Sequence, residues 1–237
     1  MVLFKNYFSR NLARHIGFCG LVITIFACQT DSIETRKDYF PLNESLVRIY
    51  EVTENTYTVT GEPTQKKYFL KEQISNITSS DGISSDFILQ RYTRNTATET
   101  WALGSIQKGT LKPDRLTFEE NGEIKPKLFF PLYDKASWTI PQSNASSEPL
   151  KVTVTKQNES LTIGNENIED IFVVQFRNDS TLIDLRRELE TYAPNIGLVS
   201  AEYTSFDYCQ STPSCIGKGI INFGTSKKMK LISYSKE

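Results

Sequence analysis

The fold class is decided by one stretch, Leu150-Lys-Val-Thr-Val-Thr155, with the polar turn Asn158-Glu-Ser160 and the run Leu161-Thr-Ile163 that follow it. The first run alternates apolar and polar side chains, which is the pattern of a strand with one buried face. A turn rich in Asn and Ser between two β-rich runs is typical of an antiparallel hairpin, because these side chains stabilise tight turns. This stretch therefore predicts antiparallel β-structure.

Similar β-rich runs recur on both sides of this stretch. Ile171-Phe-Val-Val-Gln-Phe176 is the most apolar of them and is expected to be a central strand. Asn121-Gly122, a strong hairpin signal, separates two of the upstream runs. The remaining runs are 47–52, 56–60, 67–74, 86–93, 98–103, 115–118, 127–130 and 198–206. We therefore predict one antiparallel all-β domain over residues 39–237, with about ten strands in a strongly curved sheet, an open barrel or a sandwich.

The segment Thr181-Leu-Ile-Asp-Leu-Arg-Arg-Glu-Leu-Glu-Thr-Tyr192 fits two structures. Three of its leucines fall at helical spacing among good helix formers. The same segment also alternates, with Ile183, Leu185, Arg187 and Leu189 on one face of a strand. Because its neighbours are β-rich, we favour a long strand over a helix.

The N-terminus has the layout of an export signal. Residues 1–27 contain three basic residues, no acidic residue and the twelve-residue apolar run Ile16–Ala27. A basic segment followed by a short apolar one is typical of a secretory signal peptide. This run is shorter than the roughly 20 residues that a membrane-spanning helix needs. We predict a signal peptide at 1–27 and a polar tether at 28–38.

The sequence around the predicted cut site, Ile25-Phe26-Ala27-Cys28, resembles a bacterial lipobox, in which the cysteine is diacylated and becomes the first mature residue. Phe26 departs from the usual small or aliphatic residue at its position. The alternative is an ordinary signal peptide that leaves a free thiol at Cys28. We favour lipidation at Cys28, since two or three acyl chains hold a protein stably on a membrane.

Composition narrows the chemistry that is open to the mature protein. The chain is 38% hydrophobic and 23% charged with a net charge of −1, so neither wholesale disorder nor nucleic-acid binding is expected. Its single histidine, His15, leaves with the predicted signal. Without histidine there is no Ser-His-Asp or Cys-His catalytic apparatus and no His-ligated metal. We therefore expect no enzymatic activity, no cofactor and no metal.

Two cysteines remain for a disulfide once the predicted signal and anchor are set aside. Cys209 and Cys215 enclose Gln-Ser-Thr-Pro-Ser. An exported protein meets an oxidising compartment, where such a pair closes its loop as a disulfide. We predict the disulfide Cys209–Cys215.

Three short blocks resemble a group of uncharacterised lipoproteins of Bacteroidota. The first joins Asp38-Tyr-Phe-Pro-Leu42 to Ile49-Tyr-Glu-Val52, although Ser45–Arg48 stand where that group has Gly and Trp. The second is FPLYDKASW at Phe130–Trp138, and the third is YAPNIGLV at Tyr192–Val199. The resemblance implies an all-β outer-membrane lipoprotein, periplasmic or surface-exposed. It carries no catalytic residues, because the group has no established activity.

Two hypotheses about function follow. The first is a non-enzymatic binding or structural module, held at the membrane by its lipid, whose protein, glycan or lipid partner is unknown. Trp101, Tyr133 and Trp138 are the candidate ligand contacts, since aromatic rings line grooves for such ligands. The alternative is a periplasmic carrier whose curved sheet encloses a cavity for acyl chains. A cavity lined by Phe, Leu and Ile favours the carrier.

The charged stretches of the sequence give weaker indications of function. Paired carboxylates catalyse glycoside hydrolysis, and Glu119-Glu120 and Glu169-Asp170 are candidate pairs. Neighbours on a strand point to opposite faces, so solvated turns are the favoured interpretation of both. Lys227-Lys228-Met-Lys230 is interpreted as charge on an edge strand, which discourages pairing with other sheets.

Overall fold

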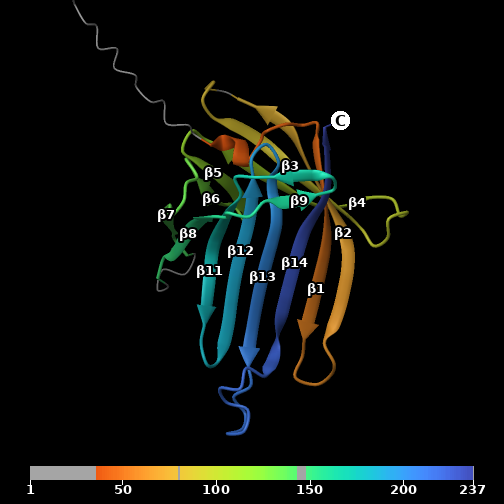
Figure 1. Ribbon diagram of the computed structural model, residues 1–237, viewed down its shortest axis with the longest axis vertical. Helices are drawn as coiled ribbons and strands as arrows, with labels where there is room; N and C mark the ends of the chain where they lie inside the picture. Colours follow the sequence, from red (N-terminus) through yellow and green to blue (C-terminus); the bar gives the residue numbers. More distant parts are fainter. Residues whose placement is uncertain (1–35, 80, 143–147, 237) are drawn as a thin grey trace, which may run out of the picture. The chain divides into compact units, whose positions relative to one another are not determined.

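A computed structural model describes residues 36–79, 81–142 and 148–236, and these residues form a strongly curved antiparallel sheet (Figure 1). The elements are η1 (Lys37–Tyr39), β1 (Leu46–Tyr57), β2 (Thr64–Thr78), β3 (Ser85–Arg94), β4 (Ala102–Leu111), β5 (Arg115–Glu120), β6 (Glu123–Phe129), β7 (Ser137–Ile140), β8 (Leu150–Lys156), β9 (Leu161–Ile163), β10 (Glu166–Ile168), β11 (Phe172–Ser180), β12 (Asp184–Ala193), β13 (Gly197–Tyr208) and β14 (Ile221–Lys236). The all-β prediction is confirmed, with fourteen strands where about ten were expected. The predicted signal 1–27 and Cys28 lie outside the described residues. In the described part of the chain, no helix has the length and apolar character needed to span a bilayer.

Twelve strands form one sheet in the order β6-β5-β4-β3-β2-β1-β14-β13-β12-β11-β8-β7. Most neighbours in the sheet are also neighbours in the chain, as antiparallel connections allow. The exceptions are the pairing of β11 with β8, between which the β9–β10 hairpin comes in the chain, and the pairing of β1 with β14, which joins the first strand to the last. β9 and β10 form a separate hairpin.

The two edges of the sheet approach each other. The ring of Phe129 in β6 lies 5.5 Å from the ring of Trp138 in β7, although the two strands are at opposite ends of the strand order. Lys127 of β6 reaches Glu190 of β12 with 2.7 Å between Nζ and Oε1. The sheet therefore curls into a nearly closed open barrel, and the sandwich alternative does not apply.

Apolar side chains fill one part of the curve. The first cluster of buried residues brings Phe87 and Leu116 together with Val152 and Phe172, so strands from both halves of the sheet share one core. All three sequence blocks that resemble the lipoprotein group contribute to it, through Tyr39 and Phe40, Phe130 and Leu132, and Tyr192. The rings of Tyr39 and Phe172 meet edge to face at 5.2 Å.

A second cluster surrounds the pairing of β1 with β14. Tyr50, Val52 and Leu231 are almost completely buried there. The β9–β10 hairpin packs Ile163 against this cluster. These contacts bury the seam at which the first strand pairs with the last.

Three local predictions are tested by these strands. From Asp184 on, the segment 181–192 is a strand, as favoured, because β12 pairs with β11 on one side and β13 on the other. Asn121 and Gly122 both have positive φ and connect β5 to β6, so the hairpin prediction is also confirmed. The edge-strand interpretation of 227–230 is wrong: β14 lies between β1 and β13, because the last strand continues the sheet from the first.

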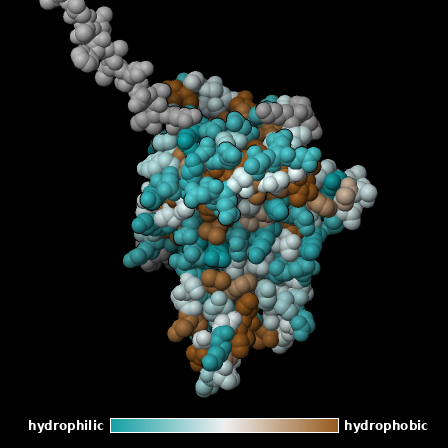
Figure 2. All heavy atoms as spheres, viewed as in Figure 1, coloured by the Kyte–Doolittle hydropathy of each residue, from teal (hydrophilic) through white to brown (hydrophobic). Residues whose placement is uncertain are grey.

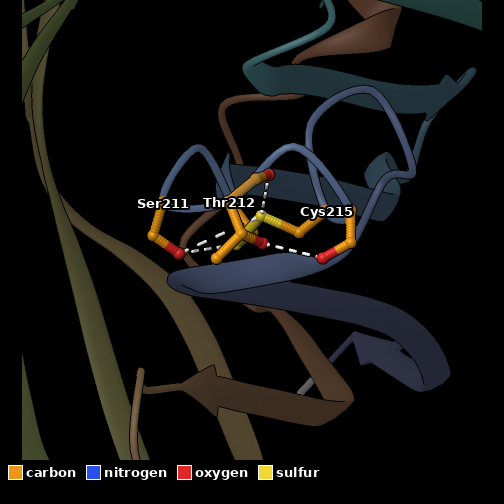
Figure 3. Close-up of a disulfide and its surroundings, with 5 residues drawn as sticks. Ser211, Thr212 and Cys215 are labelled. Atoms are coloured by element: carbon orange, nitrogen blue, oxygen red, sulfur yellow. Dashed lines mark hydrogen bonds between the residues drawn. A yellow bond between two sulfur atoms is a disulfide. The ribbon is translucent and has the colours of Figure 1, made fainter.

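The connection between β13 and β14 is held by the disulfide Cys209–Cys215, which is present as expected. The backbone N–H of Cys215 donates to the Thr212 carbonyl at 3.1 Å, so the chain turns tightly before the second cysteine. Figure 3 shows Ser211 and Thr212 beside the bridge. Hydrophobic residues gather at the lower end of the molecule in Figure 2, where Figure 1 places this loop and the β11–β12 turn. Their exposed members include Leu182, Ile216 and Phe223.

Reduction of the denatured mature protein is expected to add two hydrogen atoms to its mass, because one bridge is present. Closure of so short a loop constrains the unfolded chain, so replacing both cysteines by serine is expected to cost about 2 kcal/mol. Mass spectrometry before and after reduction, with thiol titration, measures this. Two free thiols at Cys209 and Cys215 before reduction contradict the bridge.

Candidate functional site

A cavity of about 590 Å³ lies within the curve of the sheet. Side chains from strands on both sides converge on it. Its apolar wall consists of Phe40, Leu70, Leu89, Phe118, Leu198 and Met229. Eight charged side chains share the lining: Arg48, Arg91, Lys127, Lys227, Glu72, Glu120, Glu188 and Glu190. The cavity is therefore lined by charged and apolar side chains together.

Glu72 of β2 is the centre of the first charged network. Its Oε1 accepts a hydrogen bond from Nε of Arg91 at 2.7 Å, and its Oε2 accepts one from the Tyr50 hydroxyl at 3.1 Å. Nε of Arg48 lies 3.8 Å from Oε2, and the side chains of Arg48 and Glu72 are 2% and 4% exposed. One buried carboxylate is therefore shared by two guanidinium groups, which leaves one positive charge in excess.

Arg48 and Arg91 differ in the partners of their N–H groups that do not bond Glu72. Arg48 donates from Nη1 to the Ile196 carbonyl at 3.0 Å, beside Gly197, whose φ of +90 favours glycine. Nε of Arg48 is buried without a hydrogen-bond partner among the described residues. Arg91 donates from Nη1 to Oε1 of Gln107 at 3.1 Å, and its side chain is 33% exposed. Arg91 is therefore the member of this network that a molecule in the cavity reaches.

Glu190 of β12 is the centre of the second network. Its Oε1 accepts from the ammonium of Lys127 at 2.7 Å and from the Tyr203 hydroxyl. Its Oε2 accepts from the Tyr192 hydroxyl at 2.6 Å. The ammonium of Lys127 also lies 4.2 Å from the centre of the Phe176 ring, a cation–π contact. Both oxygens of Glu190 are thus occupied.

These partners decide the charge state of the two buried carboxylates. Burial alone raises the pKa of Glu72, but Arg91 and Arg48 outweigh it and the pKa is lowered. Burial likewise raises the pKa of Glu190, and Lys127 with the hydroxyls of Tyr192 and Tyr203 lowers it below its ordinary value. Both groups are therefore ionised at neutral pH and hold their partners in place.

Glu188 is the exception. It lies two residues before Glu190 on β12, on the same face, and lines the cavity. It has no hydrogen bond or ion pair among the described residues. Burial raises its pKa, the nearby Lys127 lowers it, and the nearby Glu190 raises it, with a net rise. Glu188 is therefore a partly buried carboxylate in the cavity that still lacks a partner.

Glu188→Gln is expected to stabilise the protein at neutral pH. Because the pKa of Glu188 is higher in the folded state than its ordinary value of 4.5, the folded state loses stability as pH rises from about that value. Glutamine keeps the shape and removes the charge. The measurement is the free energy of unfolding in urea: the variant gains over wild type at pH 7 and the difference shrinks at pH 4. A loss of stability at pH 7 contradicts this account.

A second cavity, of about 550 Å³, adjoins the first, because Glu188, Tyr203 and Lys227 line both. Lys227 pairs with Glu54 at 3.4 Å, and the Tyr68 hydroxyl donates to the same carboxylate at 2.8 Å. Glu188 therefore stands where the two cavities meet.

The three aromatic residues singled out in the sequence lie elsewhere. Trp101 is covered by cations: Lys71 Nζ is 5.5 Å and the guanidinium carbon of Arg94 4.2 Å from its ring centre. Tyr133 is exposed in the connection between β6 and β7, and Trp138 contacts Phe129. None of the three lines either cavity, and the structure does not bring them together. Their role as ligand contacts stays a prediction.

Sequence reasoning missed the residues that do line the cavity. The apolar face of segment 181–192 drew attention, but the alternate residues Glu188, Glu190 and Tyr192 point into the curve. The sequence signal that could have found them is the alternation of this segment, which places Glu188, Glu190 and Tyr192 together on the face opposite Leu185 and Leu189. Among the described residues, no group of three His, Cys, Asp or Glu is placed to hold a metal ion.

No protein-family model and no curated protein matches this chain. Three solved structures are similar to it over most of their length. A protein described as a lipoprotein, from Parabacteroides distasonis, is 12% identical with a TM-score of 0.40, over 83% of this chain and 98% of that one. An exported protein with a YmcC-like fold, from Bacteroides fragilis, is 13% identical with a TM-score of 0.40, over 83% and 98%.

The third is an outer membrane lipoprotein-sorting protein domain from Vibrio parahaemolyticus, 11% identical with a TM-score of 0.20, over 84% of this chain and 88% of that one. With so little sequence identity, the function of this chain has to be argued from its own residues.

Proposed function

We propose that this protein is a lipid-anchored, non-enzymatic binding module of the bacterial cell envelope, which holds a small hydrophilic molecule in the cavity within its curved sheet. The observation that carries the proposal is the lining of that cavity, where two buried ion-paired networks frame a carboxylate without a partner. Burying charged groups such as Arg48, Glu72 and Glu190 is costly, and a protein that places them beside a cavity gains from a polar ligand.

The envelope and anchor parts of the proposal have separate support. The Cys209–Cys215 bridge is typical of proteins that leave the reducing cytosol. The basic and apolar segments before Cys28 support export, and the three blocks that resemble those of Bacteroidota lipoproteins favour an outer-membrane anchor. The partner at the membrane is then lipid, through Cys28.

The same lining argues against acyl chains as the cargo. A carrier of hydrocarbon needs an apolar cavity, whereas here eight charged side chains share the lining with six apolar ones. It also argues against carboxylate catalysis by Glu188 with Glu190. A glycosidase needs two accessible carboxyl groups, and both oxygens of Glu190 already accept hydrogen bonds within the fold.

A thermal-unfolding screen of the mature protein tests the proposal. The panel contains amino acids, short peptides, sugar acids and palmitate. At a hundred times its Kd, a ligand adds about 2.7 kcal/mol, which raises Tm by about 5–10 °C for a domain of this size. Hydrophilic compounds are expected to raise Tm and to be recovered unchanged. A rise with palmitate alone restores the carrier, and chemical conversion of the ligand contradicts a non-enzymatic role.

A further inference from the structure

The charges around the cavity are not matched within each group: positive charge exceeds negative charge around Glu72, and negative charge exceeds positive charge at Glu188. On one side, Arg48 and Arg91 share the single carboxylate of Glu72, so this group carries one surplus positive charge. Nη2 of Arg91 makes no hydrogen bond to the described residues, and neither does Nε of the buried Arg48. This side of the cavity therefore has spare donors and an unmatched positive charge.

On the other side, the charge is negative. Lys127 and Glu190 neutralise each other, while Glu188, two residues earlier on β12, has no hydrogen bond or ion pair among the described residues. Arg177, opposite Glu188 on β11, is paired with Asp179. Lys227 and Glu120, which also line the cavity, are paired with Glu54 and Lys125. One carboxylate therefore remains unmatched.

The strands between these two groups also bring apolar side chains to the cavity. Leu70, Leu198 and Met229 come from β2, β13 and β14, which lie between β3, which carries Arg91, and β12, which carries Glu188. They line the cavity beside the paired charges of the same strands, and the methylene groups of a ligand suit them.

We propose that the cavity binds a zwitterionic small molecule, with the anionic group of the ligand at Arg91, its ammonium group at Glu188 and its carbon chain against the apolar wall. This inference rests on the proposed function and names the ligand class of the same site. A guanidinium with a free N–H group can donate hydrogen bonds to either a carboxylate or a phosphate. The ammonium group supplies Glu188 with the partner that the fold does not provide.

Calorimetric titration of the mature protein with matched probes tests the proposal. The zwitterions are 4-aminobutyrate, 6-aminohexanoate and O-phosphoethanolamine, and the singly charged controls are hexanoate and hexylammonium. At least one zwitterion is expected to bind ten times more tightly than both controls, because only a zwitterion satisfies both ends. The phosphate and carboxylate probes distinguish the two kinds of anionic group. Equal binding of zwitterions and singly charged probes overturns the inference.

Two variants locate the ligand. Glu188→Gln removes the charge without breaking a contact and is expected to weaken the best zwitterion at least tenfold. Arg91→Lys keeps a positive charge beside Glu72 but loses the planar set of N–H donors of the guanidinium. It is expected to weaken binding of the same zwitterion and to leave binding of hexylammonium unaffected. The matched control is Glu51→Gln, an exposed carboxylate on the same sheet, which should leave binding unchanged. Unchanged binding in Glu188→Gln overturns the inference.

The outcomes also separate this inference from the function on which it rests. If zwitterions fail but another hydrophilic compound raises Tm in the screen and loses that effect in Glu188→Gln, the binding function stands and only the ligand class is wrong. If no hydrophilic compound binds, both are wrong. Circular dichroism of each variant shows whether the fold is retained.

Discussion

Glu72→Ala is expected to lower the free energy of unfolding by about 3–5 kcal/mol, because removing one partner of a buried ion pair leaves the other uncompensated. Arg48 is the group left behind, with its side chain 2% exposed and its Nε without another partner. Arg91 and the Tyr50 hydroxyl lose an acceptor in the same step. For a domain of this size, the loss corresponds to a fall in Tm of roughly 6–20 °C.

Urea unfolding of two further variants calibrates this result. Tyr50→Phe removes one neutral donor to the same carboxylate and is expected to cost about 1 kcal/mol. Glu51→Ala, the exposed neighbour on β1, is expected to stay within about 0.5 kcal/mol of wild type. A cost below about 1 kcal/mol for Glu72→Ala means that the arginines around it are hydrated, and the buried network described above is then wrong.

Cys28→Ala is expected to abolish the incorporation of labelled palmitate and to release the protein from membranes. The thiol of Cys28 is the proposed attachment point, and the acyl chains carried there would hold the protein on the membrane. Metabolic labelling followed by membrane fractionation measures both effects. Cys19→Ala is the matched control, since Cys19 belongs to the predicted signal and its loss should leave labelling intact. Unchanged labelling of Cys28→Ala contradicts the lipobox interpretation.

Hairpins are the part of the fold that the sequence predicts well. Asn121-Gly122 turns β5 into β6, and the alternating run at 150–155 forms β8, because turn chemistry and period-two patterns are local properties. The pairing of β1 with β14 is not local. It joins residues up to 190 positions apart, such as Leu46 and Lys236, and no short sequence pattern predicts it. For this reason the sequence suggests that the lysines of β14 lie on an edge strand, whereas β14 lies inside the sheet between β1 and β13.

The site is harder to predict for a related reason. Alternation shows that Glu188 and Leu189 lie on opposite faces of β12, but it does not say which face is inside. Apolar residues are placed inside by default, because most interiors are apolar. Here the acidic face points inward, because Lys127 comes from the far edge of the sheet to pair with Glu190. Only the closure of the sheet brings these partners together.

The buried networks also bear on why the protein keeps a charged interior. Replacing buried ion pairs with apolar residues is often neutral or stabilising in other proteins. Glu72 and Glu190 therefore do not gain their place through stability alone. Each fixes at least one cation at the wall of the cavity, and Glu190 also fixes Tyr192 and Tyr203 there; such fixed groups are what a specific polar site requires.

The central claim is that the cavity within the sheet is the binding site of a hydrophilic molecule. Amide chemical shifts of the mature protein, followed by NMR during titration with the best compound from the thermal screen, test it most directly. The account predicts that the largest shifts fall in β2, β3, β12 and β13, around Glu72, Arg91 and Glu188. Shifts confined to the apolar end near the β13–β14 loop, or produced by palmitate and by no hydrophilic compound, would contradict it.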